Sequence, residues 1–207
     1  MGIENFTAFA FTALLFIMTP GMDTIFVLNK TISQGKTSGA YAALGVNAGI
    51  IIHTLFAALG LSILVAQSGY AFTAIKYIGA LYIIYLGIMQ LRKKLDPTLN
   101  QNNIPSKTTR KNNFVSGFMT NALNPKVALF FLAFFPQFIT PTQLQNPIPF
   151  IILGLTYTVM GIVWYLCLTY FAGTFSKKFQ ESKNANLYIN KFSGMIFILM
   201  GIGIALG

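Results

Sequence analysis

The chain has 207 residues, of which 55% are hydrophobic and only 9% are charged. A soluble domain carries about a quarter of its residues as Asp, Glu, Lys or Arg, so this composition excludes an ordinary soluble protein and indicates an integral membrane protein. The net charge is +10, but the basic residues cluster between apolar runs, a pattern that orients membrane proteins. We therefore expect no nucleic-acid partner.

Several kinds of site are excluded by residue types that occur only once. The single cysteine, Cys167, allows no internal disulfide and no CxxC redox pair, and the single histidine, His53, allows no HExxH metal site. The N-terminus, MGIENF, has no basic region, so a cleavable signal peptide is not expected. We expect no cofactor, no resident metal and no catalytic residue.

Six apolar segments predict six transmembrane helices, because a helix needs about 20 apolar residues to cross a bilayer. In chain order they cover residues 6–28, 39–66, 72–91, 114–139, 148–175 and 190–207. The predicted fold class is an all-α integral membrane protein with six transmembrane helices.

Basic residues follow the first, third and fifth segments, whereas the loops after the second and fourth segments carry no charge. The basic residues are Lys30 and Lys36, then Arg92, Lys93, Lys94, Lys107, Arg110 and Lys111, then Lys177, Lys178, Lys183 and Lys191. Basic short loops stay in the cytoplasm. This pattern predicts that both termini lie outside, on the side of the membrane opposite the cytoplasm.

A polar, Asn-rich stretch at 96–113 predicts a flexible cytoplasmic linker between a first three-helix unit at 1–95 and a second at 114–207. Because three is odd, the second unit begins on the opposite side of the membrane, as in inverted-repeat transporters. Helix 3, with KYIGALYIIYLG at 76–87, also matches helix 6, with KFSGMIFILMG at 191–201. The sequence thus predicts two inverted-topology repeats.

Two helices are interrupted by proline, and each interruption adjoins a charge. Pro20 and Gly21 precede Asp23 in the first segment, and Pro125 precedes Lys126 in the fourth. A charge at mid-membrane is costly and normally faces a partner or a polar cavity. We expect Asp23 and Lys126 to pair across one cavity and to bind the ammonium and carboxylate of an amino acid. The alternatives are a static ion pair that only fixes packing, or a Lys126 side chain that extends to the membrane interface.

Other polar residues are weaker candidates for the pathway. Small residues recur along one face of the second segment, which favours close helix packing, and His53 on that face is either a proton relay or a packed, hydrogen-bonded side chain. Within or beside the helices, the amides Asn47, Asn121 and Asn124 are further candidates. For the aromatic residues Trp164, Tyr82 and Tyr85, packing is the default expectation, although each could contact substrate.

Several stretches together resemble the LysE/RhtB family of amino-acid exporters. They are TPGMDTIFVL, followed by QGKTSGAYAALGVNAGIIIHTLFAALGL, then YIGALYIIYLG, and FVSGFMTNALNPKVALFFLAFFPQF with its Asn-Pro-Lys segment. The family pattern has Pro-Gly-Pro-Asp, so Met22 replaces the second proline here. The resemblance implies six helices, an inverted repeat, an inner-membrane location and proton-coupled export of amino acids or related metabolites. A homodimer is plausible for the family.

Residue roles follow from the resemblance position by position. Asp23 and Lys126 become the leading residues of the pathway for substrate and proton. Pro20 and Gly21 keep the first break, and Asn124 and Pro125 shape the cavity at the second. His53 stays a secondary candidate.

Rival functions lack the residues that they need. An intramembrane hydrolase needs a nucleophile with a base, and no such pair is evident. A divalent-metal or other cation exporter is the closest alternative, yet it needs clustered ligands where the apolar segments offer only Asp23 and His53. The positive charge of Lys126 disfavours a cationic substrate, so we lean toward neutral amino acids such as threonine, homoserine or leucine.

Overall fold

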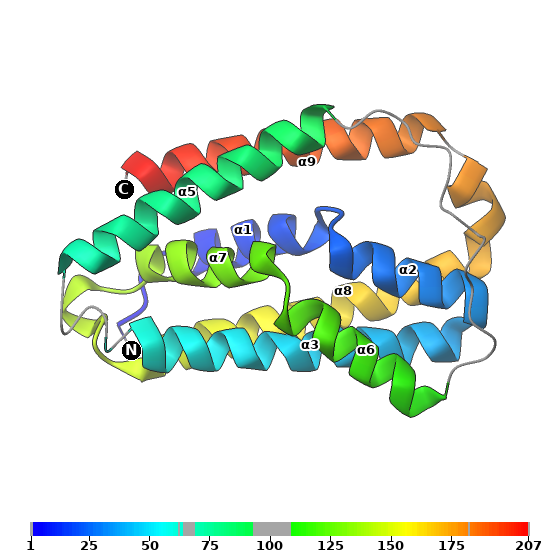
Figure 1. The fold of residues 1–207 in the computed structure, drawn as a ribbon, viewed down its shortest axis with the longest axis horizontal. Coiled ribbons are helices and arrows are strands. Elements are labelled where there is room, and N and C mark those ends of the chain that lie inside the picture. Colours follow the sequence, from blue (N-terminus) through cyan, green and yellow to red (C-terminus); the bar gives the residue numbers. More distant parts are fainter. Residues whose placement is uncertain (1, 62, 64–68, 93–108, 182, 207) are drawn as a thin grey trace.

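The computed structural model describes residues 2–61, 63, 69–92, 109–181 and 183–206. Helices make up nearly all of this part of the chain (Figure 1). They are α1 (Phe6–Met18), α2 (Met22–Gln34), α3 (Lys36–Leu55), the π-helix η1 (Phe56–Leu61), α5 (Gly69–Arg92), α6 (Arg110–Ala122), α7 (Pro125–Phe134), the 3₁₀ helices η3 (Phe135–Phe138) and η4 (Pro141–Gln143), α8 (Pro147–Glu181) and α9 (Lys183–Leu206). The prediction of an all-α chain is confirmed.

The chain runs back and forth along the long axis of the molecule, and both termini lie at the same end (Figure 1). Three helices are long and apolar enough to cross a bilayer, at Lys36–Leu61, Thr73–Arg92 and Pro147–Ala172. Two bent pairs, α1 with α2 and α6 with α7–η3, raise the number to five by length and composition. In α9 the stretch Gly194–Leu206 is a shorter apolar helix.

Several predicted boundaries are wrong, because the helices extend beyond the apolar segments. Lys30 lies within α2 and Lys36 begins α3, so Gly35 alone separates these two helices. The second half begins at Arg110 instead of 114, since Thr109 caps α6 by accepting a hydrogen bond from the Asn112 backbone N–H at 3.3 Å. Most of the predicted linker, 96–108, lies outside the described residues.

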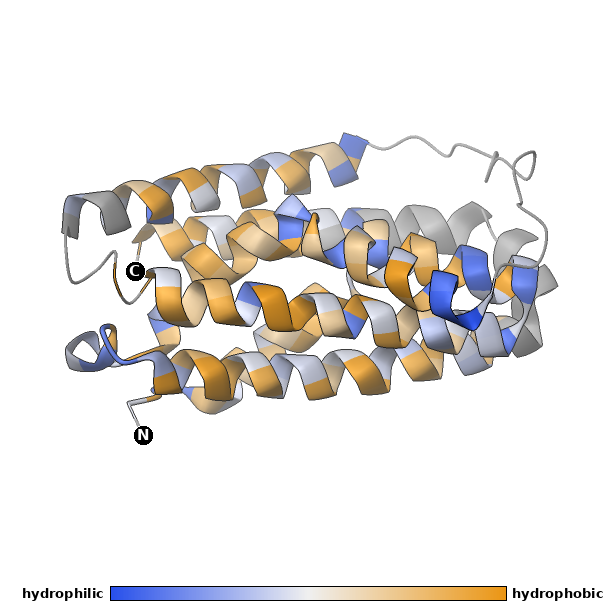
Figure 2. Cartoon of the chain, turned by 60° about the horizontal axis from the view of Figure 1, so that its bottom comes forward, coloured by the Kyte–Doolittle hydropathy of each residue, from blue (hydrophilic) through white to orange (hydrophobic). Residues whose placement is uncertain are grey.

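The end of the molecule opposite the termini is the hydrophilic one. There α2 ends, and α3 and α6 begin (Figure 1). Strongly hydrophilic residues gather where α6 begins, whereas hydrophobic residues cover most of the helix length (Figure 2). At this end Lys36 begins α3 and Arg110 begins α6. The grouping of basic residues on one side therefore appears in the described part of the fold.

Glycines let two helix pairs approach closely, and the first of them includes the predicted small-residue face of α3. A Cβ on Gly45 of α3 would overlap the Phe114 carbonyl of α6, and one on Gly117 of α6 would overlap the Ala42 carbonyl of α3. The same packing joins α5 to α9, where a Cβ on Gly87 would lie 2.7 Å from the Gly194 carbonyl oxygen. Helices α5 and α9 run side by side along one face of the molecule (Figure 1).

Aromatic rings fill the core between α1, α7, η3 and α8. Phe16 of α1 stacks on Phe130 of α7 with ring centroids 3.9 Å apart, and Phe131 stacks on Phe135 at 4.0 Å. Tyr157 of α8 meets the ring of Phe131 at 5.2 Å. Each of these rings is buried, so dense packing holds the two interrupted helices together next to the breaks.

Candidate functional site

The two interrupted helices break where the sequence predicts. The axes of α1 and α2 differ by 53°, and those of α6 and α7–η3 by 50°. Pro20 lies in the first gap, where it cannot donate a backbone hydrogen bond. Pro125 is the first residue of α7, a position at which a helix needs no N–H. Both breaks lie near the middle of the long axis (Figure 1).

Asp23 is buried at the meeting point of the two breaks, with 6% of its surface exposed. Its Oδ2 accepts hydrogen bonds from Asn121 Nδ2 at 2.9 Å and from Asn124 Nδ2 at 3.1 Å. Its Oδ1 has no hydrogen-bond partner among the described residues. Asp23 also lies in the first turn of α2, where the helix dipole favours a negative charge. One carboxylate oxygen is thus held in place while the other is left able to accept.

Lys126 reaches back from α7 to the first break. Its Nζ donates to the Thr19 carbonyl at 3.2 Å and lies 4.5 Å and 4.8 Å from the ring centroids of Phe16 and Phe197. Thr19 is the C-cap of α1, so the ammonium sits at the negative end of that helix dipole. The aromatic faces add cation–π attraction. At the first break, the negative C-terminal end of α1 therefore faces the Lys126 ammonium, and the positive N-terminal end of α2 carries the Asp23 carboxylate.

The sequence-based pairing of Asp23 with Lys126 stays a prediction, because the two charges attract each other but do not form a direct ion pair among the described residues. The two residues lie at the same break, but the Lys126 ammonium bonds to Thr19 and the Asp23 carboxylate bonds to two amides. In this conformation the Lys126 ammonium bonds to the Thr19 carbonyl at the first break, which disfavours the alternative in which it extends to a membrane interface.

His53 of α3 joins the site through Asn121. Its Nε2 lies 2.9 Å from the Asn121 carbonyl oxygen, and 5% of the residue is exposed. A carbonyl oxygen can only accept, so this nitrogen carries the hydrogen. Asn121 therefore contacts His53 through its backbone and Asp23 through its side chain, and it links the imidazole to the carboxylate.

The backbone carbonyls freed at the first break accept hydrogen bonds from side chains of other helices. Thr19 O accepts from Lys126, and Pro20 O accepts from Gln90 Nε2 of α5 at 3.4 Å. Buried backbone polar groups in lipid need such partners. Sequence reasoning missed Gln90 and Thr19. Gln90 could have been identified from the sequence as an amide side chain within the apolar segment 72–91.

Gly21 makes room for the Lys126 side chain. A Cβ added to Gly21 would lie 3.1 Å from Lys126 Nζ and 3.4 Å from its Cδ. The backbone of Gly21 is extended, with φ of −138°, so the glycine is needed here for space and not for its conformational freedom.

Asn124 has two roles at the second break. Its Oδ1 accepts from the Lys126 backbone N–H at 3.0 Å and so caps α7, while its Nδ2 donates to Asp23. One side chain thus starts a helix and orients the buried acid.

Some predicted site residues lie apart from this network. The Asn47 Nδ2 donates to the Ala43 carbonyl of its own helix at 2.8 Å, and its buried Oδ1 faces Gly161 of α8. Tyr85 is 55% exposed and packs beside Tyr82 at 6.2 Å. Cys167 is exposed.

Sequence reasoning missed two buried tyrosines of α8. Tyr157 and Tyr165 are near enough to Asp23 to interact with it electrostatically.

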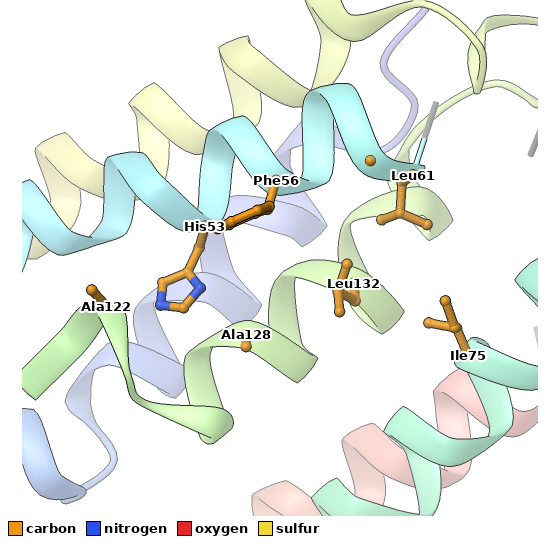
Figure 3. A pocket seen from close by; sticks show the side chains of 8 residues that line it. His53, Phe56, Leu61, Ile75, Ala122, Ala128 and Leu132 are labelled. Atoms are coloured by element: carbon orange, nitrogen blue, oxygen red, sulfur yellow. The ribbon is translucent and has the colours of Figure 1, made fainter. Parts of the chain in front are cut away.

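An apolar cavity of about 370 Å³ lies beside the second break (Figure 3). It is lined by His53, Phe56, Gly60, Leu61, Ile75, Ala122, Ala128 and Leu132. The imidazole hangs from α3 between the ends of α6 and α7, and Ile75 of α5 closes the opposite side (Figure 3). Neither Asp23 nor Lys126 lines this cavity.

Within the described ranges, no group of three or more His, Cys, Asp or Glu side chains could hold a metal ion. The polar groups gathered at the breaks are one carboxylate, one ammonium, amides and an imidazole. Such a set can bind a small zwitterion and exchange protons.

Comparisons with known proteins identify the family of the chain and several relatives. A family model described as LysE type translocator matches residues 14–207. The chain is 34% identical to the "Uncharacterized membrane protein YrhP" of Bacillus subtilis, with 99% of both chains covered. It is 32% identical to an "Uncharacterized membrane protein" of Vibrio cholerae, over 100% of this chain and 98% of the relative. It is 30% identical to the "Homoserine/homoserine lactone efflux protein" of Salmonella typhi, over 97% and 96%. No solved structure matches.

Proposed function

Because the chain belongs to the family of LysE type translocators, we propose that it exports small neutral amino acids or related metabolites across the inner membrane. The observation that carries this proposal is the buried carboxylate of Asp23 at the junction of two broken helices, with one oxygen that has no partner among the described residues. Broken helices at mid-membrane are how many secondary transporters build their substrate sites.

The substrate ammonium binds at Asp23 Oδ1, and the substrate carboxylate binds at the Lys126 ammonium. Oδ1 keeps its accepting capacity because both amides bond to Oδ2. Lys126 bonds to a neutral carbonyl, which a carboxylate can replace as the stronger acceptor. In this conformation Asp23 is buried, so substrate reaches it when the helices around the breaks move apart.

Homoserine is the first candidate substrate. One relative, at 30% identity, is named for efflux of homoserine and homoserine lactone. These two molecules share an amino group, but the lactone has no free carboxylate. A site that recognises both molecules must therefore bind the amine. In this chain we assign the binding of the amine to Asp23. Threonine and leucine share the same ammonium and carboxylate.

Proton coupling in this proposal uses Asp23 and His53. A carboxyl group that releases the substrate ammonium in exchange for a proton couples the two movements, because the buried site disfavours an unpaired charge. Asn121 bonds to His53 through its backbone and to Asp23 through its side chain, so His53 is the neighbouring titratable group and the candidate donor of that proton.

The proposed architecture is six transmembrane helices in two inverted three-helix repeats, 1–95 and 114–207, joined by a cytoplasmic linker. The similar bends of 53° and 50° in the first helix pair of each half support the repeat. The basic residues at the end opposite the termini support a cytoplasmic position for that end and an outside position for both termini. A homodimer is part of the same proposal.

The function is tested by efflux from proteoliposomes that hold the purified protein. Vesicles are loaded with homoserine, threonine, leucine, lysine or Mn²⁺, and release is measured with and without an inward proton gradient. We expect neutral amino acids to leave, faster with the gradient, and lysine and Mn²⁺ to be retained. Release of Mn²⁺ with retention of all amino acids would establish the cation-exporter alternative instead.

Asp23→Asn is the decisive variant in this assay. It keeps the size of the side chain but removes its charge, so we expect efflux to fall to the level of empty vesicles. Glu4→Gln is the matched control, because Glu4 is an exposed acid of the N-terminal segment. Normal efflux by a stably folded Asp23→Asn protein would contradict the proposed site.

A further inference from the structure

The apolar cavity beside the second break has no role in binding the ammonium or carboxylate of a substrate. We propose that it binds the aliphatic side chain of the transported amino acid, and that the protein therefore favours substrates with several side-chain carbons. This proposal rests on the proposed export of amino acids, since the cavity would hold one part of a molecule whose charged part is held at Asp23 and Lys126.

The first argument is the chemistry of the lining. Seven of its eight residues are apolar, and the eighth is the imidazole of His53. Ligand pockets of about 300–1,000 Å³ are typical of small-molecule sites, and 370 Å³ is at the small end of that range. A charged group would lose its hydration in such a space without a partner, whereas a hydrocarbon chain would gain contacts.

The second argument is that Asn121 connects the cavity to the charged site. Ala122 is the last residue of α6 and Ala128 lies in the first turns of α7, so both flank the second break. His53 lines the cavity and bonds to the Asn121 carbonyl, and Asn121 bonds to Asp23, each at 2.9 Å. A molecule with its ammonium at Asp23 can therefore direct its side chain past Asn121 toward this space.

The third argument is the local geometry that forms the cavity. Phe56–Leu61 is a π-helix and contributes Phe56, Gly60 and Leu61 to the lining of the cavity. Among them Leu61 is 1% exposed, whereas Phe56 is 67% exposed. Gly60 has no heavy atom within 4 Å of where its Cβ would be, so the space in front of it is open. Single-turn π-helices often occur at functional sites.

Gly60→Leu tests the proposal by filling this open space. Proteoliposomes are loaded with alanine, 2-aminobutyrate, norvaline or norleucine, which share the same charged groups and differ only in chain length. For the unchanged protein we expect initial efflux at low concentration to rise with each methylene, by up to about fourfold. In Gly60→Leu the ratio of norleucine to alanine efflux should fall at least about tenfold, which corresponds to the loss of two buried methylenes.

Gly203→Leu of α9 is the matched control. Gly203 also has nothing within 4 Å of its Cβ position, but it lines a different cavity between α1 and α9. We expect this variant to keep the norleucine-to-alanine ratio of the unchanged protein. If Gly60→Leu does not elute as a single species from size exclusion, Gly60→Ala is measured, with a smaller fall in the same ratio as the expected result.

Two results would overturn the proposal while export itself stands. One is an unchanged ratio in a folded Gly60→Leu protein, which is what a cavity filled by a lipid chain would give. The other is an equal fall for all four amino acids, which would mean that the substitution disturbs the helices and not a side-chain site. Failure of the unchanged protein to release any of the four would refute the proposed function, and the side-chain site with it.

Discussion

The two helix breaks bend by nearly the same angle but are stabilised in different ways. At the second break, Asn124 caps α7 with its own side chain. At the first break, the N-cap of α2 is Gly21, which has no side chain to offer. The carbonyls freed there bond instead to Lys126 of α7 and Gln90 of α5. The second break is thus complete within its own segment, whereas the first depends on side chains from two other helices.

This difference indicates which break responds to changes elsewhere. A structure that depends on long-range side-chain contacts loses its support when the contributing helix moves, whereas a local cap moves with its helix. We therefore expect the first break to rearrange when α5 and α7 shift, and the second to move as a rigid unit. Asp23 belongs to the first break but accepts hydrogen bonds from amides of the second. Motion of one break relative to the other would therefore change these hydrogen bonds directly.

After Asp23→Asn, removing the lysine from the first break should have the largest effect. Lys126→Met keeps the length of the side chain but leaves Thr19 O without its donor, and it removes the charge proposed to bind the substrate carboxylate. Hydrogen bonds to charged groups contribute about 1.5–3 kcal/mol, so we expect efflux to fall up to about 100-fold. Lys111→Met is the control, because Lys111 is an exposed lysine of α6. Equal efflux by the two variants would mean that the first break does not need its ammonium.

Substitutions of Asn124 distinguish its two roles, the capping of α7 and the orientation of Asp23. We expect them to reduce efflux less than Lys126→Met does. Asn124→Ala removes both the cap of α7 and one donor to Asp23, and loss of a cap costs about 1 kcal/mol of stability. Asn124→Ser can still cap but is too short to reach Asp23. We expect thermal unfolding in detergent to show that Ser restores the stability lost in Ala. Efflux should remain about tenfold reduced in both, as loss of one charge-assisted bond implies.

Recovery of full efflux in Asn124→Ser would contradict the orienting role. It would show that Asn121 alone positions Asp23 and that the second break matters only as a helix start. Loss of stability in both variants would instead mean that serine does not cap α7 here.

Sequence patterns predicted much of the fold because they reflect local chemistry. The two breaks follow from proline, which cannot donate a backbone hydrogen bond, and the close contact of α3 with α6 follows from the small residues on one face of α3. Helix ends were predicted less well. Lys30 and Lys36 were placed in a loop because they are charged, yet charged residues at the ends of membrane helices continue the helix into the interface.

The site was only partly predictable, because its contacts join residues far apart in the chain. Asp23, Asn121, Asn124 and His53 were candidates as isolated polar residues in apolar segments, and the structure joins them in one network. Opposite charge suggested that Asp23 pairs with Lys126. Since each has closer partners supplied by the breaks themselves, the two do not form a direct ion pair here. Gln90 and the ring of Phe197 could not be assigned without knowing which helices meet.

Gly21→Ala should have the smallest effect and tests how closely Lys126 fits the first break. Alanine adopts the extended backbone of Gly21 without strain, so the only change is a methyl group 3.1 Å from the Lys126 ammonium. The end of a lysine side chain can move by a few tenths of an ångström, so we expect efflux to fall by about fivefold or less, which corresponds to under about 1 kcal/mol. Gly203→Ala, at a position with open space, is the control. If Gly21→Ala were as inactive as Lys126→Met, small shifts of the Lys126 ammonium would be enough to abolish transport. The first break would then require a more closely fixed position of this ammonium than a flexible lysine side chain provides.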